Sequence, residues 1–342
     1  MIDKYGRKIE YVRISVTDRC NFRCIYCMPD GDISWQSREE ILTDAELLKV
    51  VGVFARMGVK RIKLTGGAPL LRPGIEQVVR AVKQTEGIEK VTLTTNGVLL
   101  GDKLEALCAA GLDGVNISLD ALMPQRFEMI TGCGTRSQLE KVLVSVRQAL
   151  TFEKLAVKLN CVPMRGVNES DCLALLDYAK NTRAAVRFIE MMPIGYGKKF
   201  EPISEDELRS MIGISLKPVS VEEGYGGGPC RYYRPDGFKG LIGFISAVSH
   251  KFCESCNRVR LTSDGYLKTC LQYDTGRDLR AVLRHVPERG NCTDESNMNE
   301  VDIKLEKAVA EAIAAKPAEH HFENAGRHDS DDEQKKMFQI GG

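Results

Sequence analysis

Segments with strand character and segments with helix character alternate from residue 9 to about residue 190. The expected strands are 9–17, 60–65, 90–95, 114–120, 155–162 and 184–190. Amphipathic helical patterns fill the gaps at 44–57, 74–85, 102–110, 137–150 and 169–180. Six such βα repeats of roughly thirty residues predict an α/β protein whose parallel sheet is covered by helices.

Each expected strand has one apolar and one polar face, because side chains alternate along a strand. The polar faces carry Arg13, Ser15, Thr17, Lys63, Thr65, Thr92, Thr94, Asn116, Ser118, Asp120, Lys158 and Asn160. A closed eight-stranded barrel fills its interior with Val, Ile and Leu, and a doubly wound sheet is apolar on both faces. The pattern therefore favours a wide, partly open barrel with a polar lumen.

Three cysteines, Cys20, Cys24 and Cys27, follow the first expected strand with the spacing CxxxCxxC, and Tyr26 precedes the third. Thiolates this close together bind one metal centre more readily than they form disulfides. Three ligands suit a [4Fe-4S] cluster with one open iron, which can chelate a small molecule. The alternative is a zinc site completed by a distant Cys or His.

A second trio consists of Cys253, Cys256 and Cys270, and His250 could complete a zinc site there. The string Asn257-Arg258-Val259-Arg260 lies within this group. On a strand, Arg258 and Arg260 would point the same way and could clamp a phosphate. The alternative is a solvated strand face.

Composition limits the location and the partners of the protein. Six of the twelve cysteines lie in the two trios, which indicates metal binding in a reducing compartment. The start of the chain lacks an apolar signal segment, and no apolar run is long enough to span a bilayer. Together these features predict a cytoplasmic protein. A net charge of +1 implies no general attraction to nucleic acid or membrane.

The βα pattern ends near residue 190, and the glycine-dense loop 224–229 is a plausible boundary. We expect residues 1–225 to form the partial-barrel core and residues 226–342 to form an α+β region that binds the second cluster. One more strand is expected at 240–248, and 274–316 is expected to be helical. The terminal Gly341-Gly342 could enter a narrow pocket because glycine has no side chain.

The first trio resembles the signature of the radical S-adenosylmethionine (SAM) superfamily. That resemblance implies a partial (β/α)6 barrel of the TIM type. It also implies that the open iron binds SAM, which is cleaved to a 5′-deoxyadenosyl radical. Gly66-Gly67-Ala68-Pro69 corresponds to the superfamily motif GGEP, which holds the methionine ammonium, and Ala68 stands where the family has Glu.

The two trios, the Asn-Arg-x-Arg string and the Gly-Gly end together resemble the GTP 3′,8-cyclase family, from about residue 5 to Gly342. The resemblance implies a lyase of molybdenum cofactor (molybdopterin) biosynthesis. It would convert GTP into (8S)-3′,8-cyclo-7,8-dihydroguanosine 5′-triphosphate and pass the product to cyclic pyranopterin monophosphate synthase. A reducing electron donor and a homodimer are further implications.

The same resemblance assigns roles to individual residues. Cys20, Cys24 and Cys27 would hold the SAM cluster, and Cys253, Cys256 and Cys270 the cluster that binds GTP. The SAM contacts would be Tyr26, Gly67, Ser118 and Met192. The GTP contacts would be Arg13, Lys63 (Arg in most of the family), Thr94, Lys158, Arg258, Val259 and Arg260. Gly341 and Gly342 would reach the active site.

Two other functions fit the sequence. One is a different radical SAM enzyme with an auxiliary cluster, such as one that modifies peptides. The other is a low-activity relic, because Ala68 removes a carboxylate that would face a cation.

Overall fold

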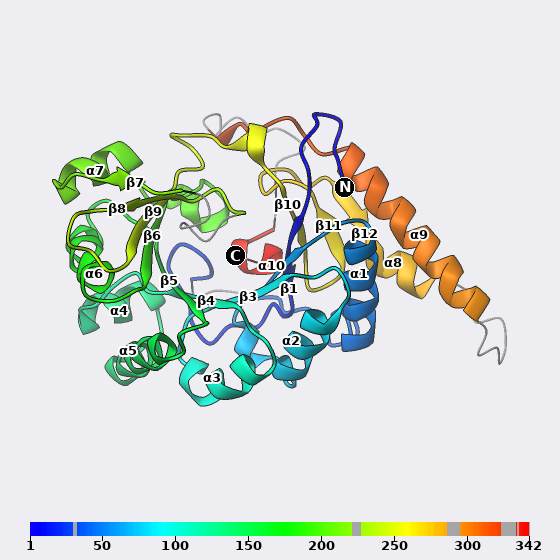
Figure 1. Cartoon of the computed structure of the whole chain (residues 1–342), viewed down its shortest axis with the longest axis horizontal. Helices are drawn as coiled ribbons and strands as arrows, with labels where there is room; N and C mark the ends of the chain where they lie inside the picture. The colour runs from blue at the N-terminus through cyan, green and yellow to red at the C-terminus, as the bar shows by residue number, and fades with distance from the viewer. Residues whose placement is uncertain (30–32, 221–226, 286–294, 323–332, 334, 342) are drawn as a thin grey trace.

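The computed structural model describes residues 1–29, 33–220, 227–285, 295–322, 333 and 335–341. Six parallel strands follow each other in chain order: β1 (Tyr11–Ser15), β2 (Arg61–Thr65), β3 (Lys90–Thr95), β4 (Gly114–Ser118), β5 (Ala156–Cys161) and β6 (Ala185–Ile189). The outer face is covered by α1 (Asp44–Arg56), α2 (Ile75–Gln84), α3 (Leu100–Ala109), α4 (Pro124–Thr131), α5 (Arg136–Thr151) and α6 (Glu169–Asn181) (Figure 1). This confirms the α/β class and the partial-barrel core, with α4 as an unexpected addition.

The strands that follow α6 and β6 in the chain extend the same sheet at both ends. β9 (Leu241–Ile245) pairs in parallel with β6, and β10 (Arg258–Leu261) pairs in parallel with β1. Antiparallel strands then follow on either side: β8 (Arg231–Arg234) and β7 (Lys217–Pro218), and β11 (Tyr266–Lys268) and β12 (Gly276–Asp278). β7 and β12 are the two edges of the sheet, so the barrel is open. The expected boundary at 225–226 lies outside the described residues and stays a prediction.

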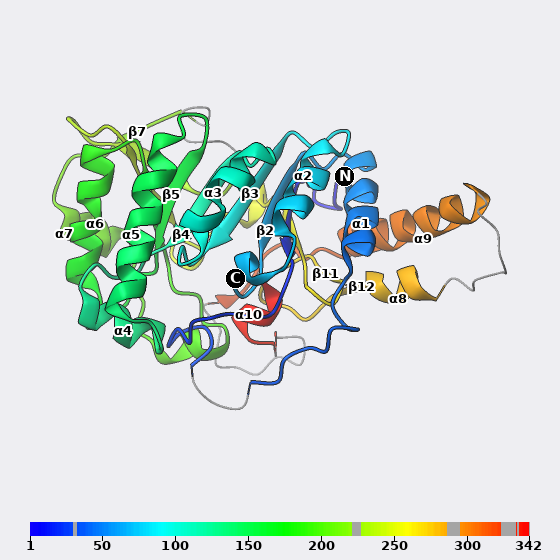
Figure 2. The same cartoon turned by 90° about the horizontal axis from the view of Figure 1, so that it is seen from below.

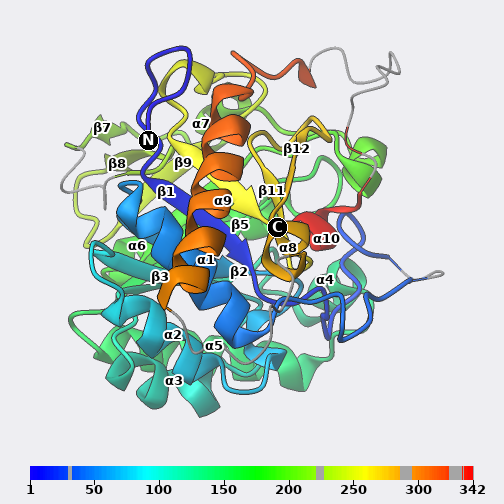
Figure 3. The same ribbon diagram turned by 90° about the vertical axis from the view of Figure 1, so that its right-hand side faces the viewer.

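The remaining helices are α7 (Glu205–Ile212), α8 (Leu279–Arg284), α9 (Glu295–Ala314) and α10 (Met337–Ile340). The expectation that 274–316 is helical throughout was wrong at β12, which pairs with β11. α9 lies across α1 (Figure 3), where Arg56 forms ion pairs with Asp302 and Glu306. α10 lies within the curve of the sheet (Figures 1 and 2). No helix in the described ranges has the length and apolar character needed to cross a bilayer.

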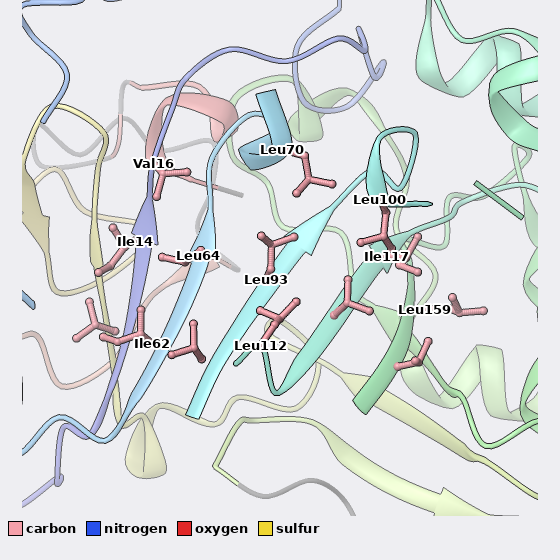
Figure 4. Packing of buried hydrophobic residues seen from close by; sticks show 14 of the residues in the cluster. Ile14, Val16, Ile62, Leu64, Leu70, Leu93, Leu100, Leu112, Ile117 and Leu159 are labelled. Atoms are coloured by element: carbon pink, nitrogen blue, oxygen red, sulfur yellow. The ribbon is translucent and has the colours of Figure 1, made fainter. Parts of the chain in front are cut away.

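The apolar strand faces form the core against the outer helices. Ile14, Leu64, Leu93, Ile117 and Leu159 are fully buried on this face (Figure 4). The Thr43 hydroxyl accepts the Glu46 N–H and the Glu46 carboxylate accepts the Thr43 N–H, a capping box that starts α1. Because alternate residues point to opposite faces, this packing turns the polar side chains into the lumen.

Candidate functional site

A cavity of about 850 Å³ occupies the inside of the sheet. Its wall contains most of the polar residues expected there: Arg13, Lys63, Thr65, Thr92, Thr94, Asn116, Ser118, Asp120, Lys158 and Asn160. Ser15 and Thr17 are buried nearby but do not line the cavity, and the Ser15 hydroxyl donates to the backbone O of Thr17. The polar faces of the strands therefore point into the lumen, as the alternation predicts.

Cys20, Cys24 and Cys27 line this cavity in the loop that follows β1. The loop is anchored to the end of α4, where the N–H groups of Arg23 and Ile25 donate to the backbone O of Thr131 and Ile130. Burial, together with the neighbouring Cys20, raises the pKa of the Cys27 thiol to about 12, and burial also raises the pKa of Cys24.

The donor set of this first trio fits an iron–sulfur cluster. All three cysteines are free thiols facing one space, and soft thiolates are the ligands that such clusters use. Their raised pKa values mean that metal binding would have to displace protons. In the part of the chain that the structure describes, no three His, Cys, Asp or Glu side chains are arranged around a single-ion site.

Gly66 and Gly67 pack against the segment 17–19, which leads into Cys20. The N–H of Gly67 donates to the backbone O of Thr17, and the N–H of Ala68 donates to that of Arg19. A Cβ atom at Gly67 would lie 2.3 Å from the Arg19 oxygen. The two glycines therefore allow the loop after β2 to hold the cysteine loop in place. Ala68 is buried and does not line the cavity.

The predicted SAM contacts Tyr26, Gly67, Ser118 and Met192 all line the cavity together with the first trio. The Tyr26 hydroxyl donates to Asp120 Oδ2 at 2.7 Å, and burial raises the pKa of Asp120 to about 6. Asp120 was not among the predicted site residues. Its position just past the end of β4, on the polar face, is the signal that could have identified it.

Six basic side chains from five strands converge in the lumen: Arg13, Lys63, Lys158, Arg187, Arg258 and Arg260. Burial and the nearby Arg187 and Arg13 hold the pKa of Lys63 well below its usual value. Burial and Arg187 lower the pKa of Lys158 to about 7, and burial and Arg13 lower the pKa of Arg260. These side chains repel one another, and an anion placed among them would relieve that repulsion.

Arg187 is a cavity residue that sequence reasoning missed. It lies on β6, is buried, and donates from Nε to Asn160 Oδ1 at 2.9 Å. The signal was available, since Arg187 is the one charged residue within the apolar run 184–189.

Some of the acidic groups in the wall already accept hydrogen bonds from other parts of the chain. Asp113 accepts from Lys83 Nζ, and Glu190 accepts from the N–H groups of Val248 and Ser249. They therefore do not add free negative charge beside the six cations.

The second trio lies at one end of the basic cluster. Cys253 begins a short 3-10 turn (Cys253–Ser255), Cys256 precedes β10, and Cys270 follows β11. Burial raises the pKa of Cys253, and the nearby sulfurs of Cys256 and Cys270 raise it further, which indicates that the three lie close together. His250, the candidate zinc ligand, instead pairs with Asp206 at 3.3 Å. The donor set of three neighbouring free thiols also fits an iron–sulfur cluster.

Cys256 differs from the other cluster cysteines. Burial raises its pKa, but Lys316 and Arg258 outweigh burial and lower the pKa to about 7. Val259 pairs with Val12 of β1, and its side chain is buried in the apolar core. Only its backbone is therefore left to contact a ligand.

The end of the chain reaches both the first trio and the basic cluster. The backbone N–H of Phe338 donates to Cys27 Sγ, and Arg260 Nη1 donates to the backbone O of Gly341 at 2.7 Å. Gly341 has a φ of +82°, and a Cβ there would lie 2.9 Å from the Cβ of Ser15. This agrees with the expectation that a glycine end enters a narrow space. Gly342 lies outside the described residues.

We expect Gly67→Ala to impair the first cluster selectively, because the added Cβ displaces the backbone that leads into Cys20. Anaerobic reconstitution should give about four irons per chain in place of about eight. Gly52→Ala on α1 is the matched control, since its Cβ meets nothing closer than 3.7 Å. A full iron content in Gly67→Ala would contradict this account of the two glycines.

Comparisons with known proteins agree with this site. Residues 14–179 match the family model of the radical SAM superfamily, and residues 184–322 match that of Molybdenum Cofactor Synthesis C. The chain is 40% identical to a GTP 3′,8-cyclase of Clostridium perfringens (strain SM101 / Type A), over 100% of both chains. It is 41% identical to the GTP 3′,8-cyclase of Peptoclostridium acidaminophilum, over 100% of this chain and 98% of that one.

A solved structure shows the same fold. Streptococcus suis SuiB bound to precursor peptide SuiA superposes with a TM-score of 0.56 and 15% identity, over 84% of this chain and 67% of that chain. On its full-length similarity to the curated relatives, the chain belongs to the GTP 3′,8-cyclase family of the radical SAM superfamily.

Proposed function

We propose that this protein is a GTP 3′,8-cyclase, which uses SAM to convert GTP into (8S)-3′,8-cyclo-7,8-dihydroguanosine 5′-triphosphate at the start of molybdenum cofactor biosynthesis. The observation that carries the proposal is the shared cavity. One region of its wall has the three thiols of Cys20, Cys24 and Cys27, and another has six basic side chains, among which Lys63 and Lys158 have lowered pKa values. This arrangement suits a radical source beside a polyanionic substrate.

The side chains of the cavity divide into two groups. Cys20, Cys24 and Cys27 would hold the first cluster, which with SAM and one electron supplies a 5′-deoxyadenosyl radical. The residues proposed to orient SAM are Tyr26, Gly67, Ser118 and Met192. The residues proposed to bind GTP are Arg13, Lys63, Thr94, Lys158, Arg187, Arg258, the backbone of Val259, and Arg260. Cys253, Cys256 and Cys270 would hold the second cluster beside the GTP.

The end of the chain has its own role in this proposal. Gly341 occupies the narrow space between Arg260 and Ser15, and its oxygen orients the Arg260 guanidinium. Arg258, Arg260 and the Gly341-Gly342 end would thus act together on the substrate. The proposal also includes transfer of the product to cyclic pyranopterin monophosphate synthase, a reducing electron donor and a homodimer. It further includes a cytoplasmic location and a division of the chain into residues 1–225 and 226–342.

The decisive assay is anaerobic reconstitution followed by addition of dithionite, SAM and GTP. We expect both 5′-deoxyadenosine and the cyclised nucleotide. Deoxyadenosine without cyclised nucleotide would favour another radical SAM reaction, such as peptide modification. If neither product forms while GTP still binds, the protein is a relic whose SAM chemistry was lost with the Glu that Ala68 replaces.

Arg187→Gln should weaken GTP binding by about tenfold to a hundredfold. The reason is that one charge-assisted hydrogen bond contributes about 1.5–3 kcal/mol. SAM binding should stay unchanged, because the Arg187 guanidinium donates to Asn160 and is not one of the proposed SAM contacts. Arg147→Gln, on the exposed side of α5, is the control for loss of one positive charge. Calorimetric titration with each ligand measures both affinities, and equal loss of SAM and GTP affinity would contradict the assignment.

GTP binding should weaken as the pH rises above about 7. In the free protein burial and Arg187 lower the pKa of Lys158 to about 7, so above that pH the amine is mostly neutral. A bound triphosphate favours the charged amine, raises its pKa, and must therefore be accompanied by proton uptake. Below pH 7 the amine is charged in both states and contributes no pH dependence.

Calorimetry in two buffers of different ionisation enthalpy, between pH 7.5 and 9, measures this uptake directly. From Lys158 alone the affinity should fall by up to about tenfold per pH unit. Lys158→Arg should reduce the uptake, because a guanidinium stays protonated over this range. Identical proton uptake by both proteins would exclude Lys158 as the titrating group.

A further inference from the structure

The segment 316–320 packs against the residues that carry the second cysteine trio. The backbone N–H of His320 donates to Cys253 Sγ. Arg7, which is paired with Asp3, donates to the backbone O atoms of Cys253, Pro317 and Ala318. This segment has no part in the proposed reaction, yet it is bound tightly to the loop that carries the cysteines.

Lys316 bridges the two strands that carry this trio. Its ammonium donates to the backbone O of Arg258, two residues after Cys256, at 3.1 Å. It also donates to the backbone O of Thr269, the residue before Cys270. Only 2% of Lys316 is exposed.

The partners of Lys316 differ from those of the other lysines near the trio. Lys268 is also buried, but it forms ion pairs with Glu333 and Asp274. Lys251, which contacts the same segment, pairs with Glu319 at 3.3 Å. Among the described residues Lys316 has carbonyl partners and no carboxylate.

An ammonium that is buried without a counter-charge is unfavourable, and a protein compensates it by a nearby anion. The anionic group available here is the cluster itself, because three thiolates carry more negative charge than the iron–sulfur core carries positive. Lys316 lies beside it, because its two carbonyl partners, Arg258 and Thr269, are within two residues of Cys256 and Cys270.

We propose that Lys316 is a positioning residue that compensates the charge of the second cluster, stabilises its reduced form and holds its two cysteine strands together. The proposal rests on the proposed function for the presence of that cluster. Reduction adds one negative charge next to a fixed cation in a region of low dielectric constant, so the cation raises the reduction potential. If Lys316 served only to bridge the strands, removing its charge would leave the reduction potential of the cluster unchanged.

The test compares Lys316→Met, Lys316→Arg and Lys251→Met in the anaerobically reconstituted holoenzyme. Redox titration followed by electron paramagnetic resonance gives the midpoint potential of each cluster. The second cluster is identified by the response of its spectrum to GTP, or by loss of its signal in Cys270→Ala. Iron content is measured in every variant.

In Lys316→Met the reduction equilibrium of the second cluster should shift toward the oxidised form by about tenfold, which is about 59 mV for one electron. Lys316→Arg, which keeps the charge, should stay near the parent protein. Lys251→Met should also stay near it, since that charge is already paired. The first cluster should not change in any of the three.

An unchanged potential in Lys316→Met, or an equal shift in Lys316→Met and Lys316→Arg, would overturn the proposal. Lys316→Met could retain only about four irons per chain. In that case, retention of the second cluster in Lys316→Arg supports the proposal, and loss of the second cluster in both variants overturns it. If the parent protein binds two clusters and neither responds to GTP, the proposed function fails. The role of Lys316 can then still be judged from the signal that Cys270→Ala removes.

Discussion

The burial of basic side chains inside the sheet is the constraint on which the rest of the site depends. Burial first, and then neighbouring positive charges, lower the pKa values of Arg13, Lys63 and Arg260. Burying like charges costs free energy, and the apolar face of the same strands offsets that cost by packing against the helices. The cavity is thus built to receive negative charge, and its shape is maintained by the core behind it.

Contacts between distant segments hold this cavity together. Gly66 and Gly67 place the loop after β2 against the loop that carries Cys20. The end of the chain, through Gly341 and Phe338, touches Arg260 of β10 and Cys27. As a consequence, a substitution at Phe338 or Gly341 should alter the surroundings of both the first trio and the basic cluster.

The extension of the sheet explains how the C-terminal third contributes to a site that the first six strands begin. Because β10 pairs with β1, Arg258 and Arg260 come to lie in register with Tyr11 and Arg13. The same pairing brings Cys256 near Arg258 and Cys270 near Arg260, although the second trio does not itself line the cavity. The segment 316–320 then contacts this trio, and Lys316 joins Arg258 to Thr269 through their backbone O atoms.

Local patterns in the sequence determined much of this protein. Period-two alternation predicted the polar lumen, and cysteine spacing predicted the two trios, because both depend on residues close together in the chain. Tertiary structure alone decided which residues meet. β10 pairs with β1, Tyr26 donates to Asp120, Arg187 donates to Asn160, and the buried Lys316 donates to the backbone next to Cys256 and Cys270. Such contacts depend on strand order and burial across the whole chain, and no local pattern of residues encodes them.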